Sequence, residues 1–174
     1  MGKEGEREKF LEAYDAWADA IFRHCYFRVS DKELAKDLVQ ETYSRAWAYL
    51  ADGGVVENFR AFLYRIANNL IIDNSRKKKA LSLDALMDEG FAPAANPTNS
   101  EAAIMGHDAL RLVRSLDEKY REVIIMRYID DLTPKEIAAV LEEKENVISV
   151  RLHRGLKKVK VLLEAEAQKS EKRK

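Results

Sequence analysis

The sequence predicts an all-α fold made of two small helical domains joined by an acidic flexible linker, the C-terminal domain containing a helix-turn-helix. Apolar residues recur at three- and four-residue spacing over most of the 174 residues, as in amphipathic helices. Only seven glycines and three prolines interrupt the chain, and the alternation typical of β-strands is absent. Residues 81–103 differ, with four acidic residues, no basic residue and two of the prolines. This composition indicates a linker between domains.

We therefore expect a first domain at 1–80, a linker at 81–103, a second domain at 104–168 and a disordered charged tail at 169–174. A structured surface loop is the alternative interpretation of the linker, but its length is unusual for a loop. The formal net charge is zero, yet from Val147 onward nine basic residues accompany three acidic ones. Basic charge therefore gathers at the C-terminal end, which is compatible with phosphate contact.

The N-terminal stretch MGKEGEREKF is charged and lacks the apolar run of a signal peptide. No apolar run approaches membrane-spanning length. Cys25 is the only cysteine, so neither an intrachain disulfide nor a cysteine zinc cluster can form. These features predict a soluble cytoplasmic protein without membrane insertion.

The first helix is expected from about Glu6 to Arg28, where aromatic and apolar residues recur at helical spacing. Ser30 is expected to cap the second helix, with Glu33 completing a capping box. One side of that helix carries Leu34, Leu38, Thr42, Ala46 and Tyr49, and the other carries Asp37, Gln40, Glu41, Ser44 and Trp47. An exposed tryptophan beside carboxylates suits a partner-binding surface. Packing of Trp47 under a neighbouring helix is an equally good alternative.

A third helix is expected from an Asn58 cap to about Lys79, after a break at Asp52-Gly53-Gly54. Its predicted buried stripe consists of Phe59, Phe62, Leu63, Ile66 and Leu70. Arg60, Tyr64, Asn68, Ile71 and Ser75 are predicted to point away from the core. An outward aromatic and an amide beside the basic run at 76–79 are typical of single-stranded nucleic acid binding. A merely solvated helix end is the alternative.

The second domain is expected to contain a helix at 102–114, a break at Leu116-Asp117, a helix at 118–129 and then a helix pair. Thr133 and Glu136 form a predicted capping box with Pro134 at the first helical position. The polar residues 142–145 then form a turn or a frayed helix end.

The second helix of this pair has a predicted buried stripe made of Ile148, Leu152, Gly155, Leu156, Val159 and Leu163. Its opposite side collects Asn146, Val150, His153, Lys157 and Lys160, flanked by Ser149 and Arg154. A short capped helix followed by a helix with such a face is typical of a helix-turn-helix, whose second helix lies in the DNA major groove. An αα-hairpin with a solvated basic side is the alternative interpretation.

Catalysis has little support in the sequence. No glycine-rich phosphate loop or metalloprotease motif occurs, and His24, His107 and His153 lie in three separate segments. We expect no enzymatic activity, no catalytic residue, no cofactor and no metal site.

Three stretches resemble bacterial RNA polymerase sigma factors of the extracytoplasmic-function (ECF) group, over roughly residues 6–165. DLVQETYSRAW at 37–47 is similar to the helix that binds core polymerase in that family. FRAFLYRIANNLIIDNSRKKK at 59–79 is similar to the helix that meets the −10 promoter element. SLDEKYREVIIMRYIDDLTPKEIAAVL followed by ENVISVRLHRGLKK is similar to the domain that reads the −35 element.

The resemblance implies a role for each matching position. For core polymerase binding it implies Asp37, Gln40, Glu41 and Trp47. For the −10 element it implies the loop at 52–58 with Arg60, Tyr64, Asn68, Asn69, Arg76 and Lys77, and for the −35 element Ser149, Val150, Arg151, His153, Arg154 and Lys157. Because Arg151 falls near the core side of its helix, we expect it to reach phosphate or an internal acid and not a base edge.

The resemblance also implies regulation by an anti-sigma factor, which no residue of the sequence itself indicates. The linker is implied to enter the polymerase channel that later holds RNA. One departure concerns Glu142, which stands where the family often has glycine. It predicts either a different turn or a modest strain cost.

These features predict an alternative sigma factor that binds core polymerase, recognises −10 and −35 elements and initiates transcription of a specific regulon. A helix-turn-helix regulator that binds duplex DNA as a dimer is the alternative, but it leaves the stretch at 37–47 without a role. A degenerate sigma-like protein that only titrates an anti-sigma factor is a third possibility, which the near-complete basic and aromatic set disfavours.

Overall fold

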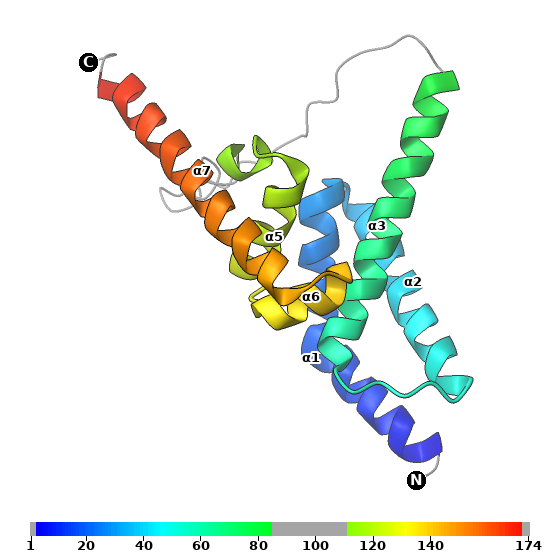
Figure 1. Cartoon of the computed structure of the whole chain (residues 1–174). Coiled ribbons are helices and arrows are strands. Elements are labelled where there is room, and N and C mark those ends of the chain that lie inside the picture. The colour runs from blue at the N-terminus through cyan, green and yellow to red at the C-terminus, as the bar shows by residue number, and fades with distance from the viewer. Residues whose placement is uncertain (1–2, 85–110, 172–174) are drawn as a thin grey trace. The chain divides into compact units, whose positions relative to one another are not determined.

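The computed structural model describes residues 3–84 and 111–171, and all regular secondary structure in these ranges is helical (Figure 1). The chain divides into two compact units, Met1–Ala94 and Ala95–Lys174. The predicted all-α class and the two helical units are confirmed. Most of the predicted linker and the start of the helix predicted at 102–114 lie outside the described residues. Residues 81–84 and 169–171, placed in the linker and in the disordered tail by the prediction, are helical, and the predicted domain bounds stay predictions.

The first unit contains α1 (Lys3–Val29), α2 (Lys32–Ala51) and α3 (Phe59–Asp84). Each of these helices packs against the other two, so all three contribute to one core. Its fully buried side chains are Ile21, His24, Cys25, Ala35, Thr42, Ala46, Leu63, Tyr64 and Ala67. Tyr49, which shares one side of α2 with Leu38, Thr42 and Ala46 by helical spacing, is 47% exposed, whereas Tyr43 is buried.

The junction between α1 and α2 differs from the prediction. Ser30 has a left-handed backbone (φ 54°), and its N–H donates to Tyr26 O at 2.8 Å, so Ser30 ends α1. Asp31 is the N-cap of α2, because its carboxylate accepts from Leu34 N at 3.1 Å. Glu33 forms an ion pair with Lys36 at 2.7 Å. The predicted capping box of Ser30 and Glu33 is therefore wrong, because the cap is the next residue, Asp31, and Glu33 pairs with Lys36.

The second unit contains α5 (Glu118–Tyr128), α6 (Pro134–Leu141) and α7 (Glu145–Glu171), preceded by helical residues 111–114. These three labelled helices are in mutual contact. The core side chains with no exposed surface are Val123, Met126, Leu132, Ile137 and Ile148. Arg111 is tied to Glu166 of α7 by an ion pair of 2.7 Å.

The start of α6 follows the prediction in every detail. Glu136 N donates to Thr133 Oγ1 at 3.2 Å, and Thr133 N donates to the Glu136 carboxylate at 2.8 Å. Pro134 occupies the first turn, where no N–H is needed. This reciprocal capping box fixes where the helix pair begins.

The turn between α6 and α7 depends on Glu142. This residue adopts the left-handed conformation (φ 55°, ψ 38°), and its N–H donates to Ala138 O. A residue with a Cβ is strained in this region, whereas glycine is not. Of the two expectations for this position, a different turn or a strain cost, the backbone supports the strain cost.

Replacing Glu142 with glycine is expected to stabilise the second unit by about 0.5–1 kcal/mol, because the left-handed strain is relieved while the unfolded chain gains some freedom. Thermal unfolding followed by circular dichroism measures the change. Glu145→Gly is the matched control, since Glu145 lies in the first turn of α7 and the same change there weakens a helix. Equal effects of the two substitutions would contradict the strain.

The predicted buried stripe of α7 is right only in its N-terminal half. Ile148, Leu152 and Gly155 are buried, but Leu156 and Leu163 are 43% and 48% exposed. Figure 1 shows α7 continuing past α5 and α6, so these helices do not cover its C-terminal half.

Gly155 allows α7 to approach α5 closely. A Cβ at this position would lie 3.1 Å from Ile124 Cγ1 and 3.5 Å from Tyr120 Cβ. Gly155→Val is expected to destabilise the second unit by about 1–3 kcal/mol, because a branched side chain forces the helices apart. A urea titration measures the loss. Gly5→Val is the control, since nothing lies within 4 Å of a Cβ added at Gly5, and a similar loss there would contradict the packing argument.

Candidate nucleic-acid and protein interfaces

The Trp47 face of α2 consists of Asp37, Gln40, Glu41 and Trp47, all of which are exposed. Trp47 retains 42% of its surface, which supports an exposed tryptophan over the alternative of packing under a neighbouring helix. Phe10 of α1 lies against its ring, with centroids 5.2 Å apart. Glu41 is paired with Arg45 at 2.7 Å. The face thus combines one large exposed aromatic side chain with acidic residues on the same helix.

Beneath this face lies an apolar floor formed by Tyr43. Its ring is edge-on to Tyr14, with centroids 4.8 Å apart, and 6.0 Å from Phe10. Burial, followed by the neighbouring phenols of Tyr14 and Tyr64, raises the pKa of Tyr43 well above its usual range. Tyr43 therefore stays neutral at any physiological pH, and the floor carries no charge.

The predicted orientation of α3 is wrong for Tyr64 and Asn68. Both were expected to point away from the core, but they are 0% and 2% exposed, and Ile71, expected on the same outward side, is only 8% exposed. The reason is that α3 packs against both α1 and α2, so it buries a wider sector than one apolar stripe. His24 of α1 is also buried and lies edge-to-face with Tyr64 at 4.9 Å. Their polar groups are therefore part of the core of the unit.

The face of α3 that does remain accessible is defined by Arg65, Asn69, Ile72 and Arg76, which share one side by helical spacing. Asn69, Arg76 and Lys77 are exposed, while Arg60 and Arg65 are half-buried. We call Arg65, Asn69, Ile72 and Arg76 the α3 face. Sequence reasoning missed Arg65, although its spacing from Asn69 and Arg76 was a readable signal.

Two aromatic rings continue the α3 face toward the loop at 52–58. Phe62 lies 5.1 Å from Tyr49, and the guanidinium of Arg65 lies 5.7 Å from the Phe62 ring centroid. Tyr49 and Phe62 both keep accessible surface. An aromatic pair beside a cation is a surface on which an unpaired base can stack.

The α7 face consists of Ser149, Val150, His153, Arg154 and Lys157, and every one of these residues is exposed. Asn146 and Lys160 are exposed on the same helix. The predicted outward orientation of this set is therefore confirmed. Arg151 is the exception, with a side chain that is 26% exposed and pairs with Glu143 at 2.7 Å. Of the two contacts expected for Arg151, a phosphate or an internal acid, the structure shows the acid.

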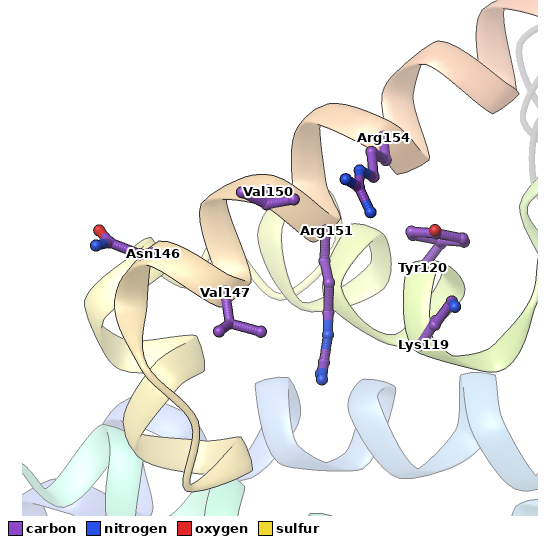
Figure 2. A pocket seen from close by; sticks show the side chains of 7 residues that line it. All are labelled: Lys119, Tyr120, Asn146, Val147, Val150, Arg151 and Arg154. Atoms are coloured by element: carbon purple, nitrogen blue, oxygen red, sulfur yellow. The ribbon is translucent and has the colours of Figure 1, made fainter.

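An open pocket of about 440 Å³ lies between α5 and the N-terminal half of α7. Its lining consists of Lys119, Tyr120, Asn146, Val147, Val150, Arg151 and Arg154. Figure 2 shows Arg151 and Arg154 extending from α7 on the side where Lys119 and Tyr120 project from α5. Three of the lining residues are cations and none is acidic, so the pocket favours an anion.

Tyr120 forms the floor of this pocket and is 8% exposed. The ammonium groups of Lys119 and Lys158 lie 5.1 and 5.2 Å from its ring centroid. Cation–π attraction holds both lysines close to the pocket. Two helices that are separate in sequence thus contribute to one basic surface, which the sequence pattern of α7 alone does not reveal.

Comparison with known families gives two matches, one in each unit of the chain. The family model of sigma-70 region 2 matches residues 13–81, and that of sigma-70 region 4 matches residues 107–159. The first contains the Trp47 face and the α3 face, and the second contains the α7 face.

Individual relatives agree with these matches. The chain is 30% identical over 164 residues to the ECF RNA polymerase sigma factor SigW of Bacillus subtilis, with 88% of each chain covered. It is 28% identical to the ECF sigma factor SigL of Mycobacterium tuberculosis, with 87% of this chain and 86% of the relative covered.

Solved structures show the same fold. The sigma factor RpoE of Bartonella quintana, solved with the anti-sigma factor NepR, superposes with a TM-score of 0.69 at 22% identity, over 90% of this chain and 98% of RpoE. CnrH, solved with the cytosolic domain of CnrY, gives a TM-score of 0.67 at 24% identity, over 93% and 92%.

Sigma factors are transcription-initiation factors and not enzymes, so the prediction of a non-enzymatic role is confirmed. The matches to both sigma-70 regions and the extent of the similarity to SigW leave one assignment. The chain belongs to the ECF family of RNA polymerase sigma factors.

Proposed function

We propose that this chain binds core RNA polymerase through the Trp47 face, recognises the −10 promoter element through the α3 face and the −35 element through the α7 face, and thereby initiates transcription of a specific set of genes. The observation that carries the proposal is the coexistence of three exposed surfaces with different chemistry. One is aromatic and acidic, one combines aromatic rings with cations, and one is basic on a helix-turn-helix.

The Trp47 face suits a basic helical partner. Trp47 is exposed on this face and its ring lies against Phe10, so a partner can bury it without unfolding the unit. Exposed aromatic anchors of this kind dominate the binding energy of protein interfaces. Asp37 and Glu41 add negative charge, which orients a positively charged partner. Tyr14, which is 46% exposed, widens the apolar area.

The α3 face suits an unpaired strand. Tyr49 and Phe62 provide stacking, while Arg65, Arg76 and Lys77 neutralise phosphate. We assign base capture to these rings, to Asn69 and to the adjacent loop at 52–58. Tyr64 and Asn68 act from the core, where they hold α3 in place.

The α7 face suits duplex DNA. Ser149, Val150 and His153 present small or polar groups, which can enter a major groove. Arg154, Lys157 and the pocket with Lys119 supply the cations for flanking phosphates. In helix-turn-helix proteins the N-terminal residues of the second helix contact base edges in the major groove, which supports this assignment.

We extend two further properties from relatives to this chain. RpoE and CnrH were solved with NepR and with the cytosolic domain of CnrY, and we propose that an anti-sigma factor likewise controls this protein. We also propose that it acts in the cytoplasm, where the polymerase is. Across residues 3–84 and 111–171, no helix is both long and apolar enough to cross a membrane.

Pull-down of core polymerase by the full chain, followed by run-off transcription from candidate promoters, tests the proposal. Co-purification with core polymerase and promoter-dependent transcripts are expected. A dimeric helix-turn-helix regulator would instead bind duplex DNA without retaining polymerase, and that result would overturn the proposed function.

A further inference from the structure

The cations around the pocket between α5 and α7 fall into two groups. Arg151 Nη2 donates to Glu143 Oε1 at 2.7 Å, and Lys158 Nζ lies 3.3 Å from Asp117 Oδ2. Within residues 111–171, no carboxylate is paired with Lys119 or Arg154. The pocket therefore combines available cations with cations that are already neutralised.

The two ion pairs differ in strength. The side chains of Arg151 and Glu143 are 26% and 37% exposed, whereas those of Lys158 and Asp117 are 50% and 61% exposed. A shorter and less solvated pair is screened less by water and salt. Arg151 is therefore the more firmly held of the two cations.

From this arrangement we infer that Glu143 is an intramolecular competitor of DNA phosphate for Arg151, which lowers the affinity of the α7 face for DNA of any sequence. Carboxylate and phosphate oxygens accept hydrogen bonds from the same guanidinium N–H groups. Arg151 therefore cannot bind both Glu143 and a phosphate at full strength. Phosphate contacts supply the sequence-independent part of DNA affinity. A competitor on one such contact reduces binding to non-specific DNA and leaves base readout by the α7 face untouched. The inference rests on the proposed role of α7 in binding duplex DNA.

Two substitutions at Glu143 separate the effect of its charge from the effect of its side-chain contact with Arg151. In Glu143→Gln the side chain keeps its length and an acceptor oxygen but loses its charge, while Glu143→Ala removes both. If Glu143 competes with phosphate, both variants bind DNA more tightly. If Glu143 instead orients Arg151 for DNA, the alanine variant binds more weakly.

Fluorescence anisotropy of the full chain with a mixed-sequence duplex of about 30 base pairs at low salt measures this affinity. Glu143→Gln and Glu143→Ala are each expected to tighten binding about two- to five-fold, the scale of one partly exposed ion pair. Asp117→Asn is expected to have a smaller effect, because the Lys158 pair is longer and more exposed. Thermal melts confirm that each variant is folded.

Glu145→Gln is the matched control, because it removes the same charge two positions along the chain. Within residues 111–171, Glu145 forms no ion pair. A double-mutant cycle with Arg151→Gln completes the test, and the gain from Glu143→Gln is expected to disappear in that background. An equal gain from Glu145→Gln, or a gain that persists without Arg151, would overturn the inference alone. Unchanged DNA binding by Arg154→Ala would overturn the proposed role of α7 itself.

Discussion

Trp47→Ala is expected to lower the affinity of the chain for core RNA polymerase by about 30-fold or more. The expected size is that of an interface hot spot, about 2 kcal/mol or above. Trp47 is the largest exposed group on a face otherwise formed by an amide and two carboxylates, and its 42% exposure leaves a large area for a partner to cover. Its loss removes that anchor and the contact with Phe10.

The decisive measurement is quantitative co-purification with core polymerase at several concentrations of the chain. Tyr26→Ala is the matched control, because Tyr26 is a 40% exposed aromatic residue on α1 outside the Trp47 face. Both variants lose a ring contact within the unit, to Phe10 or to Phe22, so their melting temperatures should fall by similar amounts. Equal polymerase binding by the two variants would contradict the proposed face.

Features that depend on a few neighbouring residues could be predicted from the sequence. The Thr133–Glu136 capping box and the Asn58 cap, whose carboxamide accepts from Ala61 N at 2.9 Å, are such features. A cap requires one polar side chain at a fixed distance from the first free N–H groups. The wrong cap at Ser30 shows that such a prediction is uncertain by one residue. Ser30 and Asp31 could both cap the helix, and the left-handed backbone of Ser30 leaves the role to Asp31.

The face that α3 buries could not be predicted in the same way. Helical periodicity ranks apolar residues, and it therefore placed polar Tyr64 and Asn68 outside. Their burial results from the simultaneous packing of α1 and α2 on α3, which is a tertiary property. The outward set on α7 was predicted correctly, because the residues opposite its short apolar stripe remain exposed.

The basic pocket also required the structure. Its lining joins residues more than twenty positions apart on α5 and α7, and the Gly155 contact brings these helices together. The position of Arg151 on its helix predicted contact with a phosphate or an internal acid. The structure shows that Glu143, which follows the turn residue Glu142, is paired with it. The sequence therefore predicted which residue types lie on the surface. The packing of the helices determines which of these residues lie together on one surface.

Arg154→Ala is expected to abolish most promoter-dependent transcription while leaving core polymerase binding unchanged. Arg154 is exposed, lines the pocket, and is paired with no carboxylate in residues 111–171, so its charge is available to DNA. Loss of one such contact costs about 1–3 kcal/mol, or about 5- to 150-fold in affinity. Arg154 belongs to the second unit, whereas the Trp47 face belongs to the first. We therefore expect polymerase binding to be unchanged.

Run-off transcription and polymerase pull-down on the same Arg154→Ala preparation separate the two activities. Lys160→Ala is the matched control, because Lys160 is also an exposed cation of α7 but lies outside the pocket lining and 4.0 Å from Glu164. It is expected to lose much less transcription. If Arg154 contacts phosphate, its removal also reduces the salt slope of duplex binding by about 1, whereas a base contact leaves that slope nearly unchanged. Similar transcription by the two variants would show that net charge on α7, and not the placement of Arg154 at the pocket, drives promoter binding.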